Sequence, residues 1–179
     1  VRYMNSHKFA KVLYNPFFDN SLRYIYQAQM EEFLRLYGKP PSHVDGHRHN
    51  HLCTNLLVRP VIPVGQKVRR SFTFSAGEKG RFNLAYRRMV DKSLARRYVL
   101  TDYFFSLYSC LKTGQMSRMA ELARKGKVEL MAHPIKDLEY DFLMGNEFDE
   151  WFSDVKLESF SELNQADAET DLQPLLQGS

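Results

Sequence analysis

The chain lacks the features of membrane-spanning and disulfide-stabilised proteins. No apolar run approaches the ~18 residues that a membrane span needs, and the first residues show no signal-peptide pattern. Cysteine occurs only at Cys53 and Cys110, without Cys-x-x-Cys spacing, which argues against a disulfide scaffold or a thiolate metal cluster. We therefore expect a cytoplasmic protein without a membrane partner. Its 179 residues, 44% of them hydrophobic, suit one domain with its own core.

Acidic residues are scarce in the middle of the chain, where positive charge gathers. Residues 67–97 contain ten basic residues, interleaved with aromatic rings, against Glu78 and Asp91. Such a mixture is compatible with a nucleic-acid surface. However, Gly77 and Gly80 interrupt the run, no nucleic-acid-binding motif accompanies it, and the formal net charge is only +4. We favour a solvated helix face plus a strand, and expect no nucleic-acid partner.

Histidine is concentrated in one stretch, Pro-Ser-His-Val-Asp-Gly-His-Arg-His-Asn-His, at 41–51. Four of the six histidines lie there, at odd positions that an extended strand would turn to one face together with Asp45. Burying such groups without partners is costly, whereas imidazole and carboxylate are common ligands of zinc and similar ions.

Distance limits how many of these histidines one ion can bind. In a straight strand, His43 and His51 would stand roughly 26 Å apart, while metal–nitrogen bonds are about 2.1 Å long. We therefore expect the strand to end between His47 and His49, leaving one or two ligands and some supporting groups. The alternative is a solvent-exposed, histidine-rich loop without a metal.

The pattern of apolar residues predicts alternating helices and strands. We expect helices at 21–37, 52–58, 83–98, 117–125 and 148–153, and strands at 42–46, 67–74, 99–105, 128–132 and 157–160. This alternation predicts an α/β fold with a mostly parallel sheet or a (β/α) barrel. In such folds reactive groups gather beyond the carboxyl ends of the strands, so we expect residues 45–49, Asp102 and His133 to share one rim.

Three separated motifs resemble the YdjC-like carbohydrate deacetylases, which include the chitooligosaccharide deacetylases. Residues 38–51 are similar to the family's Pro-Thr-His-x-Asp-x-His-x-His-x-His segment, with Ser42 in place of threonine. Residues 101–104 resemble its Thr-Asp-x-Phe segment, and residues 128–134 resemble its Glu-Leu-Met-x-His-Pro strand end. The resemblance implies a distorted (β/α) barrel of the YdjC-like/NodB-like kind that hydrolyses N-acetylated sugars with the help of one divalent metal ion, magnesium or zinc.

The same resemblance implies roles for individual residues. His47 would ligate the ion, which would polarise the acetyl carbonyl and lower the pKa of a bound water. His133 would donate a proton to the departing amine, with a structural histidine as the alternative. Asp45 would join the catalytic group by orienting a ligating imidazole. The remaining candidates, His43, His49 and Asp102, would line or brace the site.

Two parts of the family pattern have no counterpart in this sequence. The family's Asp-Asp-Phe-Gly segment and its Gly-x-His segment are absent, and neither His7 nor Asp19 lies in a matching context. We expect residues 1–160 to be the carboxyl-terminal part of one incomplete barrel and residues 161–179 to be an acidic, flexible tail. An inactive fragment, a shortened relative without catalysis, a non-catalytic sugar- or metal-binding module and a homodimer remain open.

Overall fold

The computed structural model describes residues 11–74 and 77–163, and all statements below concern these residues. Ten elements follow the initial 3-10 turn η1. In chain order the structure contains η1 (Pro16–Phe18), α2 (Asp19–Tyr37), η2 (His47–Leu52), α3 (Thr54–Val58), α4 (Arg81–Ala95), β1 (Tyr103–Ser106), α5 (Leu107–Thr113), α6 (Met116–Ala123), β2 (Val128–Met131), α7 (Asp137–Met144) and α8 (Glu147–Phe152).

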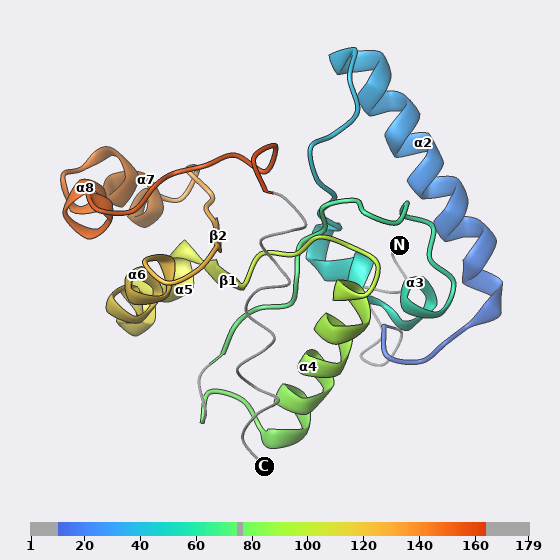
Figure 1. Cartoon of the computed structure of the whole chain (residues 1–179), viewed down its shortest axis with the longest axis horizontal. Helices are drawn as coiled ribbons and strands as arrows, with labels where there is room; N and C mark the ends of the chain where they lie inside the picture. Colours follow the sequence, from blue (N-terminus) through green and yellow to red (C-terminus); the bar gives the residue numbers. More distant parts are fainter. Residues whose placement is uncertain (1–10, 75–76, 164–179) are drawn as a thin grey trace.

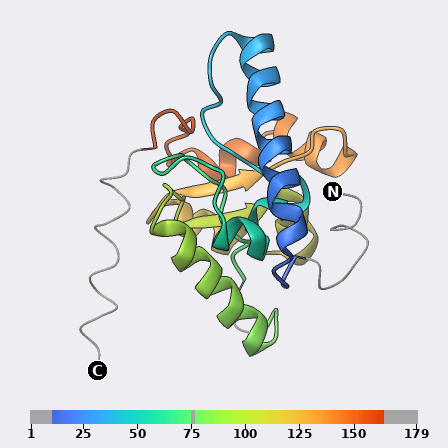
Figure 2. The same ribbon diagram turned by 90° about the vertical axis from the view of Figure 1, so that its right-hand side faces the viewer.

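The extended segments lie side by side in the order of the sequence. β1 and β2 pair in parallel, with Tyr103 opposite Val128 and Ser106 opposite Met131 (Figure 2). Isolated parallel bridges join Val44 to Val68 and Lys67 to Val99. Consecutive parallel neighbours are typical of βαβ units, so the predicted α/β class with a parallel arrangement is confirmed. A complete barrel is not present in the described residues.

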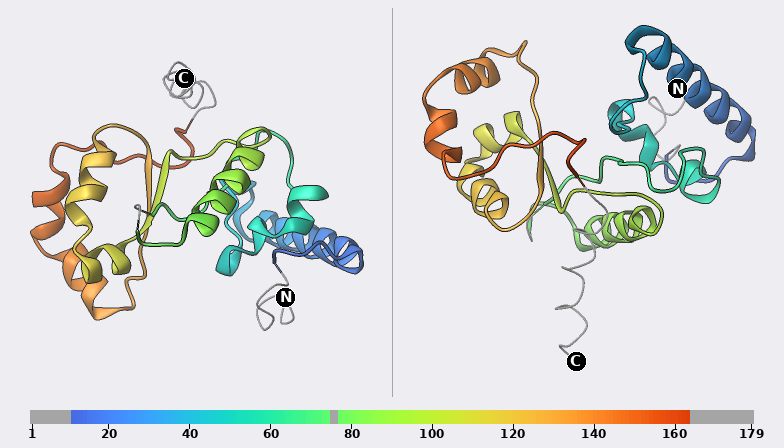
Figure 3. Two further views of the ribbon diagram at one scale, coloured as in Figure 1. Left: turned by 90° about the horizontal axis from the view of Figure 1, so that it is seen from below. Right: turned by 45° about the horizontal axis from the view of Figure 1, so that its top comes forward.

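Two groups of helices flank these extended segments, and each has its own core. α5 to α8 cover one face of β1 and β2, where Phe105, Leu107 and Met119 are buried. α4 packs through Val90 and Leu94 against Val68. Figures 1 and 3 show α5 to α8 at one end of the molecule and α2 and α3 at the other, with α4 and the extended segments between them.

Local sequence signals account for the helices that were predicted. α2 ends at Gly38, whose φ of 66° places it in the left-handed region that glycine adopts without a steric penalty. The helices expected at 21–37, 52–58, 83–98, 117–125 and 148–153 correspond to α2, α3, α4, α6 and α8, and are confirmed apart from their ends. α5 and α7 were not predicted.

The strand predictions were less accurate. Only 128–132 became a regular strand over most of its length, as β2, whereas 42–46 and 67–74 contain isolated bridges. The strand predicted at 157–160 is wrong, because these residues form an irregular segment and a turn. The predicted tail lies mostly outside the described residues, as does His7. None of the described helices combines the length and apolar character needed to cross a bilayer.

Candidate functional site

The histidine-rich stretch leaves the extended conformation where the distance argument predicted. Val44 pairs with Val68, and the chain then turns at Gly46 into η2, which begins at His47. His47 is exposed at this turn. The odd-numbered histidines therefore do not share one strand face, and each has different surroundings.

His51 is a structural histidine that joins two segments of backbone. Its side chain is buried, with 4% of the residue exposed. The N–H of Gly46 donates to Nδ1 at 3.0 Å, so the proton of the neutral ring is on Nε2, which donates to the Arg69 carbonyl at 2.8 Å. Burial lowers the pKa of His51, which favours this neutral form. Both ring nitrogens are therefore occupied, and neither is available to a metal ion.

Arg48 and His49 adopt left-handed backbone conformations, with φ of 53° and 58°. Such conformations cost residues other than glycine of order 1–3 kcal/mol each, and they are concentrated at functional sites. The turn directs the His49 ring against Phe72, at a centroid distance of 4.7 Å. Burial, and then the charges of His51 and Arg69, lower the pKa of His49 to about 4. His49 is therefore neutral at neutral pH and packed among aromatic rings.

His43 lies on the other side of Val44 from the turn. Its ring stacks on Phe160 with centroids 3.9 Å apart and planes 12° apart, and its Nδ1 lies 3.1 Å from the Ser42 hydroxyl. This contact ties the segment before the turn to the chain that follows α8. The role predicted for His43, as a residue that lines or braces the site, stays a prediction.

Arg69 links two carboxylates, and the sequence did not single out this network. Its Nε lies 2.7 Å from Glu129 Oε1, and an amino group lies 2.6 Å from Asp45 Oδ2. The guanidinium also lies over the Phe104 ring, 4.5 Å from its centroid. Because neighbouring residues of a strand point to opposite faces, Phe104 and Glu129 face away from the helices on which Phe105 packs.

This network gives Asp45 a partner that the sequence did not predict, and its expected catalytic role stays a prediction. The carboxylate was expected to orient a ligating imidazole, but its ion pair is with Arg69. Burial raises the pKa of Glu129, although the hydrogen bond and charge of Arg69 oppose that shift. The sequence offered one sign of this network, which is the position of Glu129 near the start of the motif that ends at His133. A buried charge in a strand requires a partner, but the sequence did not show that Arg69 supplies it.

His133 lies just beyond the carboxyl end of β2 and is exposed. Its backbone N–H donates to Glu139 Oε2, and its Nδ1 lies 3.6 Å from Glu139 Oε1. The Glu139 side chain is fully buried, and the Lys136 ammonium lies 3.5 Å from the same oxygen. Glu139 thus holds the loop that presents the imidazole, and this residue was also missed from the sequence.

Asp102 is not at the predicted end of its strand. It precedes β1, and its Oδ2 accepts the backbone N–H of Lys127 at 2.7 Å, just before β2 begins. The expectation that it shares a rim with His133 is therefore wrong, because His133 follows the carboxyl end of β2. In this structure Asp102 fixes the start of the β1–β2 pair.

The expected divalent ion does not fit the described residues. Within 11–74 and 77–163, no three histidine, cysteine, aspartate or glutamate side chains are grouped so that they could hold one ion. His51 uses both ring nitrogens, and His49 packs among aromatic rings. His47, which is exposed, is in a position to offer an imidazole from this stretch.

The fold and the placement of these residues define the class of the protein. It is an α/β protein with parallel strands, in which exposed histidines follow the carboxyl ends of two extended segments. The model of the YdjC-like protein family matches residues 3–154, and the chain belongs to this family. The comparisons with curated proteins and with solved structures gave no match.

Proposed function

We propose that this protein takes part in the hydrolysis of acetyl groups from N-acetylated sugars such as chitooligosaccharides. The observation that carries the proposal is the match to the YdjC-like family across 3–154, which suggests a carbohydrate deacetylase. The placement of His47 and His133 supports it, because both follow carboxyl ends of parallel segments. Reactive groups gather at this end of the strands in parallel α/β folds.

His133 is the proposed general acid. An amide nitrogen is a poor leaving group unless it is protonated, so the reaction needs a proton donor near the departing amine. Glu139 anchors the loop through the His133 backbone and lies near Nδ1, which leaves Nε2 for a substrate. The exposed ring is accessible to a sugar from solvent.

Asp45 is the proposed carboxylate of the site. Its side chain is 29% exposed, so a water molecule or a sugar hydroxyl can approach the oxygen that Arg69 does not hold. Arg69 fixes the position of the carboxylate and reduces the cost of its partial burial. His43 and His49 would shape the surroundings of the substrate.

The participation of a magnesium or zinc ion remains a proposal that rests on the family resemblance. His47 would supply one ligand, and a metal would activate water for attack on the acetyl carbonyl. The described residues do not form a complete ligand set for such an ion.

An acetate-release assay tests the proposed function. The purified 179-residue chain is incubated with N,N'-diacetylchitobiose, with and without a chelator, and acetate is measured over time. We expect release that is lost in His133→Ala and His47→Ala. A matched control is His7→Ala, since His7 lies outside the motifs. Wild-type release that neither active-site substitution reduces would contradict the proposal.

A non-catalytic sugar-binding relative is the second candidate. The observation in its favour is that the described residues contain no group able to hold a metal ion. This candidate predicts that calorimetry detects binding of N,N'-diacetylchitobiose while no acetate is released. Sugar binding weakened by His133→Ala, without turnover in the wild type, would favour it over the deacetylase.

A further inference from the structure

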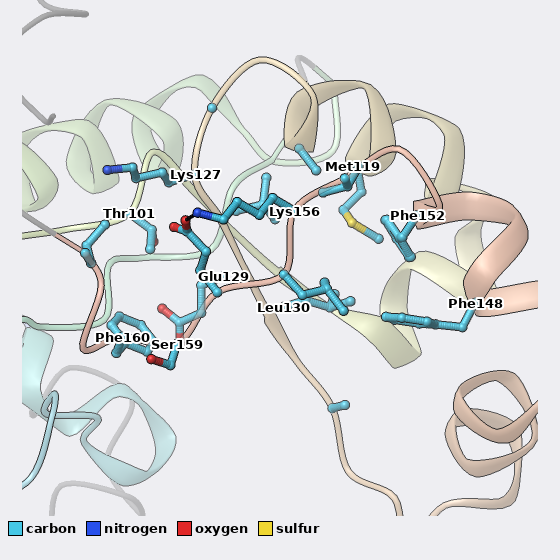
Figure 4. Close-up of a pocket in the computed structure, with 18 of the residues that line it drawn as sticks. Thr101, Met119, Lys127, Glu129, Leu130, Phe148, Phe152, Lys156, Ser159 and Phe160 are labelled. Carbon is cyan, nitrogen blue, oxygen red and sulfur yellow. Dashed lines mark ion pairs between the residues drawn. The ribbon is translucent and has the colours of Figure 1, made fainter.

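A cavity of about 510 Å³ lies between β2, the helices α6 to α8 and the segment 155–163 (Figure 4). Its volume is in the range of about 300–1,000 Å³ that small-molecule sites occupy. Histidine is not among the described residues that line it, although Phe160 in its wall stacks on His43 and Glu129 shares Arg69 with Asp45.

The cavity has an apolar end and a polar end. Figure 4 shows Phe148, Phe152 and Met119 gathered at one end, with Thr101 and Glu129 toward the other. The apolar end is formed by the helices that cover β2, and the polar end lies at the face of the strand that carries Glu129. A ligand that fits both ends must be amphipathic.

Two polar atoms at this cavity are buried without a partner in the described residues. They are Oγ1 of Thr101 and Oε2 of Glu129, and each residue is only 8% exposed. The other carboxylate oxygen of Glu129, Oε1, accepts a hydrogen bond from Arg69. Arg69 therefore holds the side chain in place, while Oε2 has no hydrogen-bond donor in the described residues. Buried polar atoms in native proteins nearly always have a hydrogen-bond partner, so we expect a bound molecule to supply one for these two atoms.

The charges around the cavity favour a neutral ligand. Lys127 and Lys156 line it and oppose a cation, while Glu129 and Glu158 oppose an anion. Lys156 is ion-paired with Glu158, and the Ser159 hydroxyl lies 2.5 Å from that of Ser161. These partners leave Thr101 and Glu129 as the groups that a ligand can satisfy.

A hydroxyl group matches the two atoms chemically. It donates one hydrogen bond, which the Glu129 carboxylate oxygen can accept, and it accepts one, which the Thr101 hydroxyl can donate. We propose that the cavity is a binding site for a neutral amphiphile with a hydroxyl group on an apolar chain or ring. The hydroxyl lies between Thr101 and Glu129, and the apolar part lies against Phe148 and Phe152.

The test uses the alcohol 4-phenyl-1-butanol and its methyl ether, which has the same apolar part without the hydroxyl donor. Isothermal titration calorimetry on the full chain is expected to show one alcohol bound per chain. The ether is expected to bind about tenfold more weakly or worse, because a hydrogen bond to a charged group is lost. Neither compound is a sugar or an amide, so the result is independent of acetate release.

Variants locate the bound alcohol. Thr101→Val keeps the shape and removes the hydroxyl, and should weaken binding by about fivefold or more. It should not lower the melting temperature, since the hydroxyl has no partner to lose. The matched control, Thr113→Val, alters an exposed residue of α5 and should leave binding unchanged. Leu143→Trp should block the apolar end.

Three results would overturn the proposal. The first is no detectable binding of the alcohol up to its solubility limit, which would mean that water alone fills the cavity. The second is equal affinity for the alcohol and the ether. The third is an affinity that Thr101→Val and Leu143→Trp both leave unchanged, which would place the alcohol elsewhere on the protein.

Discussion

Substitution of Arg69 by methionine tests the network that connects the histidine turn to β2. Methionine keeps much of the apolar stem but removes the guanidinium, so Glu129 is left buried without its counter-charge. The exposed fractions of the Arg69 and Glu129 side chains are 13% and 7%, so water does not compensate for the loss. Removing one partner of a buried ion pair costs about 3–5 kcal/mol, and we expect an unfolding free energy lower by that amount at pH 7.

The effect should depend on pH, with a defined sign. Burial raises the pKa of Glu129 in the folded protein, so the carboxylate is penalised once it ionises. The folded state is therefore favoured below the unfolded pKa, near 4.5, and stability is lost as pH rises through the folded pKa. Without Arg69 the folded pKa rises further. The penalty of Arg69→Met should thus be small near pH 4 and large at pH 7.

Urea denaturation followed by circular dichroism, at several pH values, measures how the unfolding free energy of each variant depends on pH. The double variant Arg69→Met/Glu129→Gln should recover about 0.5–3 kcal/mol relative to Arg69→Met and should lose the pH dependence. As a matched control, Arg124→Met removes an exposed ion pair with Asp154 and should change stability little. Additive penalties in the double variant, or a pH-independent loss, would refute the reasoning.

Three further predictions concern the turn and the loop after β2. His49 should titrate near pH 4 by NMR, and titration near pH 6.5 would contradict its burial. Because the folded-state pKa is lowered, the contribution of His49 to the unfolding free energy should be complete above about pH 6.5 and be lost as pH falls toward 4. Gly46→Ala places a Cβ 2.7 Å from the backbone nitrogen and the Nδ1 of His51, so urea denaturation should show a loss of about 1–3 kcal/mol, and an unchanged midpoint would exclude the close approach. Glu139→Ala removes the acceptor of the His133 N–H and should cost about 1–3 kcal/mol by the same assay. An unchanged unfolding free energy would show that Glu139 does not hold this loop.

The sequence predicted those parts of the fold that depend on local signals. α2, α4 and α6 follow from apolar periodicity and, for α2, from the glycine that ends it. α5 and α7, of 7 and 8 residues, were missed, although α3, α6 and α8 are no longer and were predicted. Isolated helices of this length are marginal, so their formation depends on packing that no local pattern reports. α5, for example, buries Leu107 and Cys110 against the helices that follow.

The candidate site was predictable as a stretch of chain but not as a set of contacts. Distance alone indicated that the histidine-rich strand must turn near His47, and η2 begins there. Which histidine would be buried depended on the Arg69 carbonyl, which is 18 residues away from His51. The partner of Asp45 likewise comes from another segment. Tertiary pairing of this kind has no signature in a local pattern.

We propose that His47 and His133 serve one reaction, although they lie on segments far apart in the sequence. The most direct measurement is a double-mutant cycle on kcat/KM for acetate release from N,N'-diacetylchitobiose, with His47→Ala, His133→Ala and the double variant. Residues that act as a unit show strongly non-additive effects. We predict large losses in each single variant and little further loss in the double variant. Undiminished kcat/KM in either single variant, or losses that add fully, would contradict the account.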